Sequence, residues 1–189
     1  MGSFFALGAQ RGGDSVGLMP IPPFVRDLRR HVGTDLLWLP GVTVVVRDDA
    51  GRILLTQRAD NHRWALVSGI VDPGEEPGLA AAREVLEETG VTVVVEALAA
   101  VSTTGEVVYP NGDRSTYLDL LFTARPTSPD AAAAAHVADD ESLAVGWFSP
   151  DALPDDVSPS TVERLGLLRR FEEAGSGAAV FVREQPIEG

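Results

Sequence analysis

The stretch Gly69-Ile-Val-Asp-Pro-Gly-Glu-Glu-Pro-Gly-Leu-Ala-Ala-Ala-Arg-Glu-Val-Leu-Glu-Glu-Thr-Gly-Val91 combines a glycine turn, a Pro-Gly turn and a short amphipathic segment. Pro77 suits the first position of a helix, because its missing N–H leaves no hydrogen bond unmade there. Gly90 suits the left-handed residue that commonly follows a helix. We therefore expect a helix between these two residues.

This predicted helix has one apolar and one acidic face. At about 100° per residue, the apolar face collects Leu79, Ala82, Val85, Leu86 and Thr89. Glu84, Glu87 and Glu88 crowd the other face, where each like-charge pair costs roughly 0.2–0.5 kcal/mol. Arg83 offsets part of this repulsion through Glu87. Because hard divalent cations take carboxylate oxygens, the cluster is either a solvated acidic face or a metal site.

The whole stretch resembles the Nudix box, Gly-x5-Glu-x7-Arg-Glu-U-x-Glu-Glu-x-Gly-U, in which U is a bulky aliphatic residue. Every fixed position of this motif is matched, by Gly69, Glu75, Arg83, Glu84, Val85, Glu87, Glu88, Gly90 and Val91. Nine matched positions within 23 residues form a specific signal. The wider resemblance to the family covers roughly residues 40–150.

Membership of this family implies an α/β fold, an α/β/α sandwich with a mixed β-sheet. It implies that Glu84, Glu87 and Glu88 are both the catalytic carboxylates and the ligands of Mg²⁺ or Mn²⁺. The carbonyl of Gly69 is expected as a further metal ligand. One of these glutamates, or a carboxylate outside the box, is expected to act as general base.

Other box residues have structural roles by the same resemblance. Glu75 and Arg83 are expected to form an ion pair that ties the loop to the helix, and Gly90 is expected to end the helix. Ser68 departs from the double glycine that is common before the box. This departure affects the expected loop geometry rather than metal binding.

Five residues outside the box are candidates for binding substrate. Arg58 and Arg63 are either solvated loop residues or phosphate ligands, since the guanidinium fork matches phosphate oxygens. Trp64 is either a core residue or a contact to a nucleobase. Tyr109 either stacks on a base or is an aromatic residue at a strand end beside the Asn-Gly turn. Glu141 is either an extra carboxylate near the metal or part of an exposed acidic loop.

Composition excludes several kinds of chemistry. The 189 residues contain no cysteine, and all 15 basic residues are arginine, so thiolate sites, Schiff-base lysines and Walker-type phosphate loops are excluded. The cysteine-dependent isopentenyl-diphosphate isomerase branch of the fold is set aside for the same reason. A net charge of −13 argues against broad nucleic-acid binding, and no apolar run reaches the length of a membrane span. We expect a cytoplasmic protein whose partner is a small nucleotide.

The order of patterns along the chain indicates one domain. Residues 1–20 are expected to be a flexible tail, residues 21–175 the Nudix domain and residues 176–189 a C-terminal tail. A helix over Pro22–Val32 is expected to pack on the domain or on a second subunit, which leaves a homodimer open. A final helix is expected over 161–174. The predicted strands are 41–47, 52–58, 64–68, 91–101, 104–109, 115–124 and 143–148, with a hairpin joining the first two.

The expected reaction is hydrolysis of a nucleoside diphosphate linked to another group, with ADP-ribose or a nucleotide sugar favoured. The ending Trp147-Phe-Ser-Pro-Asp-Ala-Leu-Pro154 and the helical lead resemble ADP-ribose-type Nudix pyrophosphatases. Tyr109 instead resembles the tyrosine of the dinucleoside-polyphosphate subfamily. The alternatives are therefore a nucleoside triphosphate or dinucleoside polyphosphate as substrate, or a non-catalytic module that senses nucleotides.

Overall fold

A computed structural model describes residues 21–181 of the protein as two β-sheets with helices packed against them. The larger, six-stranded sheet has the order β4-β1-β7-β5-β9, with β6 also paired to β7. The smaller sheet has the order β3-β2-β8. β1 and β7 run parallel to each other in the larger sheet, β4 is antiparallel to β1, and β5 is antiparallel to β7 and parallel to β9. The expected mixed α/β fold is confirmed.

The elements follow one another along the chain without a second domain in the described residues. The strands are β1 (Leu37–Val46), β2 (Ile53–Arg58), β3 (Trp64–Ala65), β4 (Val67–Ile70), β5 (Val93–Thr103), β6 (Val107–Val108), β7 (Arg114–Pro126), β8 (Ser142–Phe148) and β9 (Val180–Phe181). The helices are α1 (Pro23–Val32), α2 (Pro77–Thr89), α3 (Pro129–Ala133) and α4 (Pro159–Ala174). None of these helices is long and apolar enough to cross a membrane.

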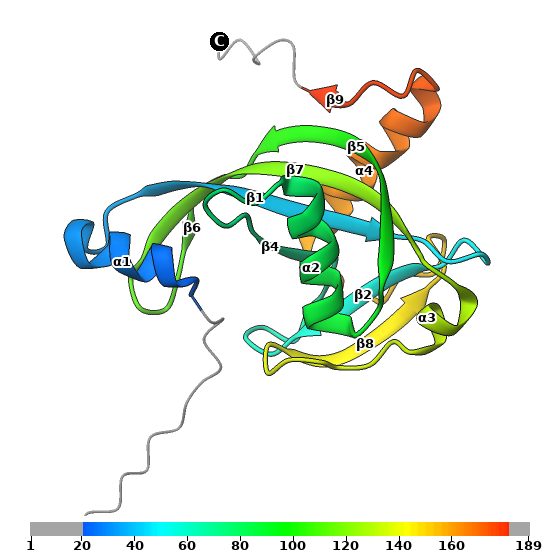
Figure 1. Cartoon of the computed structure of the whole chain (residues 1–189), viewed down its shortest axis with the longest axis horizontal. Coiled ribbons are helices and arrows are strands. Elements are labelled where there is room, and N and C mark those ends of the chain that lie inside the picture. Colours follow the sequence, from blue (N-terminus) through cyan, green and yellow to red (C-terminus); the bar gives the residue numbers. More distant parts are fainter. Residues whose placement is uncertain (1–20, 182–189) are drawn as a thin grey trace, which may run out of the picture.

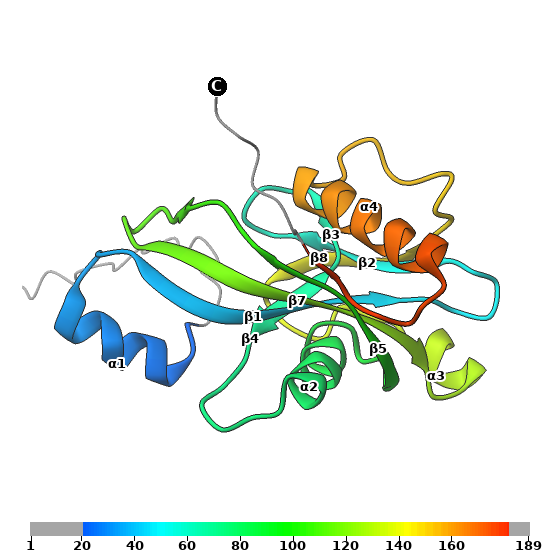
Figure 2. The ribbon, with the colours of Figure 1, turned by 90° about the horizontal axis from the view of Figure 1, so that it is seen from above.

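Two apolar clusters hold the layers together on opposite faces of the larger sheet. In Figure 2, α2 lies on one side of the sheet and α4 on the other. The first cluster joins Val85 of α2 to Val42 and Val44 of β1. The second joins Leu168 of α4 to Val45 and Leu121. The central strand β1 therefore contributes alternate residues to both clusters, as expected for a sheet covered on both faces.

The face that α2 turns to the sheet differs from the expected one. Ala80, Ala81 and Val85 are buried, whereas Leu79 and Leu86 are 66% and 46% exposed. The expectation was therefore right for Val85 and Thr89 and wrong for the two leucines, in whose place Ala80 and Ala81 face the sheet. Small residues allow the axis of α2 to approach the sheet closely, and α2 lies over the sheet beside β4 (Figure 1).

Two expected strand arrangements are also wrong. β1 and β2 do not form a hairpin, and only an isolated bridge between Arg47 and Ile53 connects them. β1 is already paired on both sides, with β4 and β7, so β2 pairs with β3 and β8 instead. The single strand expected over 64–68 is interrupted at Leu66, whose N–H donates to the Thr161 hydroxyl at 3.1 Å. The chain passes there from the smaller sheet to the larger one.

The first helix, expected over Pro22–Val32, is present as α1 and is followed by Gly33, and β6 pairs with β7 as a hairpin. Arg29 docks α1 on its own domain, by donating to the Arg114 carbonyl at 2.7 Å and the Ser115 hydroxyl at 3.1 Å. The predicted C-terminal tail is wrong in part, because β9 pairs with β5. The expected tail over 1–20 lies outside the described residues.

Leu168→Ala should destabilise the fold by about 2–5 kcal/mol, because Leu168 is 3% exposed and fills the second cluster. Val162→Ala on the same helix should change stability by less than about 0.5 kcal/mol, since Val162 is 54% exposed. Chemical denaturation of both variants measures the difference. Equal effects would contradict the packing of α4 on the sheet.

Candidate active site

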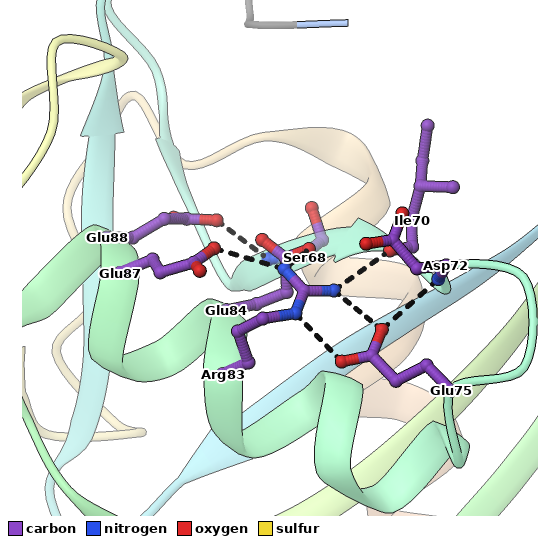
Figure 3. Close-up of polar contacts among 8 residues, drawn as sticks. All are labelled: Ser68, Ile70, Asp72, Glu75, Arg83, Glu84, Glu87 and Glu88. Atoms are coloured by element: carbon purple, nitrogen blue, oxygen red, sulfur yellow. Dashed lines mark hydrogen bonds and ion pairs between the residues drawn. The ribbon is translucent and has the colours of Figure 1, made fainter. Parts of the chain in front are cut away.

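Arg83 occupies the centre of the polar network on α2 (Figure 3). Its Nε and Nη2 donate to the two carboxylate oxygens of Glu75 at 2.8 and 2.9 Å. Its Nη1 donates to Glu84 at 2.8 Å and to Glu87 at 3.0 Å. Nη2 also reaches the Ile70 carbonyl at 3.2 Å. The expected ion pair with Glu75 is present, and the arginine holds the pKa of that carboxyl below its usual range.

Glu84 lies directly against the backbone of β4. A Cβ atom placed on Gly69 would overlap the Glu84 carboxyl carbon, so a larger residue there would displace this carboxylate. Burial raises the pKa of Glu84, although Arg83 acts in the opposite direction. Gly69 therefore allows the Glu84 carboxylate to lie against the strand.

Glu88 reaches from α2 to both sheets. Its carboxylate oxygens accept from the Ser68 N–H of β4 and the Thr56 hydroxyl of β2, each at 3.4 Å. Desolvation raises the pKa of Glu88 well above its usual value, and the charges of Glu84, Asp139 and Glu141 raise it further. The group therefore lies among further negative charges, with Arg58 within electrostatic reach.

The backbone of β4 places a different carbonyl toward the glutamates than expected. Alternate residues of an antiparallel strand turn their N–H and C=O groups to the same side. The Val71 N–H donates to the Pro40 carbonyl of β1 at 3.2 Å, so Gly69, two residues earlier, also faces β1. Ser68 faces the open edge, where its N–H meets Glu88. The Ser68 carbonyl is thus the better candidate for a backbone ligand than the expected Gly69.

A cleft between the two sheets begins at Glu88. Residues that line it include Thr56, Arg58, Asp60, Ser68, Glu88 and Glu141. Arg58 donates to both carboxylate oxygens of Asp60, at 3.0 and 2.6 Å, and thereby lowers the pKa of Asp60. Burial, with the charges of Asp139 and Glu84, raises the pKa of Glu141 to about 7. The structure therefore brings Arg58 and Glu141 to the box glutamates.

Three other candidates lie outside the residues that line this cleft. Arg63 is exposed in the loop between β2 and β3. Trp64 packs edge-on against Phe148, with ring centroids 4.7 Å apart, and belongs to the second apolar cluster. The Tyr109 hydroxyl forms a hydrogen bond of 2.6 Å with the Tyr117 hydroxyl.

Two further cleft residues, Thr56 and Asp60, were not identified from the sequence. Thr56 lies within an ordinary strand pattern, and its contact with Glu88 depends on the pairing of β2 in the smaller sheet. Asp60 follows Arg58 by two residues in a polar loop. The two-residue spacing of Arg58 and Asp60 was the one feature of the sequence that indicated this contact, because it permits a local ion pair at the end of a strand.

The side chains fit a hard divalent cation by donor type and charge. Glu84, Glu88 and Glu141 are carboxylates whose pKa values are all raised by burial and by one another or by neighbouring acids. Within residues 21–181, no three acidic or histidine side chains already enclose a metal-sized position. One reason is that Arg83 engages Glu84 and Glu87.

Comparison with known proteins agrees with this architecture. A family model of the NUDIX domain matches residues 37–168. A MutT-like protein from Streptomyces ambofaciens is 37% identical over 132 residues, which cover 70% of this chain and 75% of that protein. An RNA pyrophosphohydrolase from Azorhizobium caulinodans is 38% identical over 69 residues, covering 33% of this chain and 41% of that protein.

A solved structure gives the same result for the fold. The MutT NUDIX hydrolase from Burkholderia pseudomallei superposes with a TM-score of 0.54 at 26% identity, covering 70% of this chain and 98% of that one. Nudix hydrolases generally use divalent metal ions and act on small nucleotide substrates. Because the family match spans the glutamate helix, the cleft and both sheets, the chain belongs to the Nudix family and is a Nudix pyrophosphohydrolase.

Proposed function

We propose that this Nudix hydrolase uses Mg²⁺ or Mn²⁺ to cleave the phosphoanhydride bond of a nucleoside diphosphate linked to another group. One observation carries the proposal. Glu88 is desolvated among further carboxylates at a cleft that also contains Arg58. A desolvated carboxylate among further acids suits a metal ion, and an arginine beside it suits a phosphate.

The residues that hold the ion are Glu84, Glu87 and Glu88, together with the Ser68 carbonyl. A bound divalent ion supplies charge neutralisation on the phosphates and lowers the pKa of water. Arg83 fixes the rotamers of Glu84 and Glu87 through its Nη1 atom. The hydrogen bonds from Ser68 and Thr56 orient the carboxylate of Glu88.

Arg58 and Glu141 contribute to the reaction from the opposite wall of the cleft. The guanidinium of Arg58 is held by Asp60 in the cleft, where its positive charge attracts a substrate phosphate. Glu141 lies beside the same cleft and is our candidate for the general base, which accepts a proton from the attacking water. This assigns the base to a carboxylate outside the box.

The favoured substrates are ADP-ribose and nucleotide sugars, on the resemblance of the chain ending to ADP-ribose-type Nudix pyrophosphatases. A second candidate is the 5′ end of an RNA, because one relative is an RNA pyrophosphohydrolase. The net charge of −13 disfavours long RNA, since few cations are available for its backbone. Both substrates present a phosphoanhydride bond to the cleft.

Removal of divalent metal should abolish turnover, because the carboxylates of the cleft then lack their counter-charge. Activity is measured in metal-free buffer with EDTA, and then after addition of Mg²⁺ or Mn²⁺ in excess. Binding of Mn²⁺ to the folded protein should also raise its melting temperature, and more so at higher Mn²⁺ concentration. Full turnover in excess EDTA would disprove the metal requirement.

Glu88→Gln should lower kcat on the order of 100-fold or more, since the neutral amide is a poor ligand for a hard cation. The melting temperature without metal should stay equal or rise, because one charge leaves a repelling cluster. Glu76→Gln is the matched control, since Glu76 is exposed on the loop before α2 and outside the network of Arg83. Wild-type turnover by Glu88→Gln at saturating Mg²⁺ would exclude Glu88 as a ligand.

Products separate the candidate substrates. We expect a higher kcat/KM for ADP-ribose or another nucleotide sugar than for nucleoside triphosphates, dinucleoside polyphosphates or 5′-triphosphorylated RNA. AMP and ribose phosphate from ADP-ribose identify cleavage of the central anhydride. A triphosphate that outperforms every nucleotide sugar would reject the stated preference.

A further inference from the structure

The segment 134–141, between α3 and β8, passes the C-terminal end of the glutamate helix α2 (Figure 1). An α-helix leaves its last four carbonyls without a partner inside the helix. On α2, the Thr89 carbonyl accepts from the His136 N–H at 3.0 Å. The Glu88 carbonyl accepts from the Ala138 N–H at 3.2 Å. The main chain of the helix end is therefore bonded directly to the chain that leads into β8.

The side chain of His136 packs over the glycine that follows α2. Its Nδ1 lies 2.7 Å from the Ala134 carbonyl, and because a carbonyl oxygen only accepts, this nitrogen carries the hydrogen. A Cβ atom on Gly90 would overlap the imidazole ring, so the ring occupies space that only this glycine leaves free. Gly90 thus admits the ring of His136 in addition to ending the helix with its left-handed φ of 69°.

Glu141 is held at the other end of the segment by main-chain hydrogen bonds. Its N–H donates to the Asp139 carboxylate at 3.1 Å, and its carbonyl accepts from the Ala59 N–H at 2.8 Å. The Asp139 carboxylate also accepts from the Ser142 N–H at 3.2 Å. Two residues separate Glu141 from Ala138, which is bonded to α2. The place of Glu141 in the cleft therefore depends on contacts at both ends of this short stretch.

We propose that His136 is a positioning residue, which keeps the segment 134–141 docked on α2 and so sets the position of Glu141 relative to Glu88. The proposal rests on the function proposed above, in which Glu141 accepts a proton from the attacking water. His136 lies outside the set of described residues that line the cleft, so it acts through Glu141 and does not touch the substrate.

Removal of the imidazole ring has two consequences for the segment. It leaves a gap over Gly90, and it removes the side-chain hydrogen bond to the Ala134 carbonyl. The segment is then free to shift along the end of α2. A general base acts only within hydrogen-bond reach of the proton it accepts, so a small displacement of Glu141 slows the reaction strongly.

The first experiment measures kcat and KM of His136→Ala with ADP-ribose, or with the nucleotide that surpasses it. We expect kcat to fall roughly 10- to 100-fold while KM stays near the wild-type value, since the base moves and the phosphate contacts do not. His136→Asn should recover part of kcat, because its amide N–H replaces the donor to Ala134. His31→Ala, at an exposed histidine of α1, is the matched control. Wild-type kcat in His136→Ala would overturn the proposal.

The second experiment repeats His136→Ala in a Glu141→Gln background. Because His136 acts through Glu141, its substitution should lower kcat no further once the carboxylate is gone. Equal fold losses in both backgrounds would overturn the proposal, since His136 would then act independently of Glu141. The affinity of His136→Ala for Mn²⁺, measured by calorimetry, should stay near that of the wild type. A loss of Mn²⁺ affinity that matches the loss of kcat would place the effect on the metal ligands and would also overturn it.

Amide hydrogen exchange tests the docking without turnover. The amides of residues 136–142 should exchange faster in His136→Ala than in the wild type, whereas those of α4 should keep their rates. Unchanged exchange over 136–142 would overturn the proposal even if activity fell. Faster exchange in His136→Ala, together with wild-type turnover by Glu141→Gln, would reject the base assigned under the proposed function and support the docking role of His136.

Discussion

The interaction on which the site depends is the contact of one arginine with three carboxylates and a carbonyl. Glu84, Glu87 and Glu88 repel one another on α2, and Glu75 adds a further charge nearby. Arg83 binds Glu75, Glu84 and Glu87, and its bond to the Ile70 carbonyl joins them to β4. Glu88 is outside this set. The arginine therefore offsets most of the repulsion while leaving one desolvated carboxylate at the cleft.

Close approach of the helix to the sheet is the second constraint, and it follows from small residues on both sides. Ala80 and Ala81 of α2 are fully buried, and Gly69 of β4 leaves space for the Glu84 carboxylate. Larger side chains at these positions would move the helix outward and separate the glutamates from Ser68 and Thr56. The geometry of the site thus depends on small residues between helix and sheet as much as on the charged groups.

The local elements could largely be predicted from the sequence, and the pairings between strands that are distant in sequence could not. Pro77 and Gly90 correctly bounded α2, because caps depend on adjacent residues alone. The prediction that β1 and β2 form a hairpin was wrong, because β1 pairs instead with β4 and β7, which are distant from it in sequence. The box residues were identified from their spacing along the chain, whereas Thr56 and Asp119 were not identified. Their contacts arise only when separate strands are brought together.

The division into two sheets explains where the carboxylates of the site gather. β4 is an edge strand whose open side faces β2 of the smaller sheet, and the carboxylates gather in the space between them. The opposite face of β1 and β7 carries no such charge excess, because Asp119 is paired with Arg164. A phosphate that reaches the carboxylates needs a metal ion to bind there.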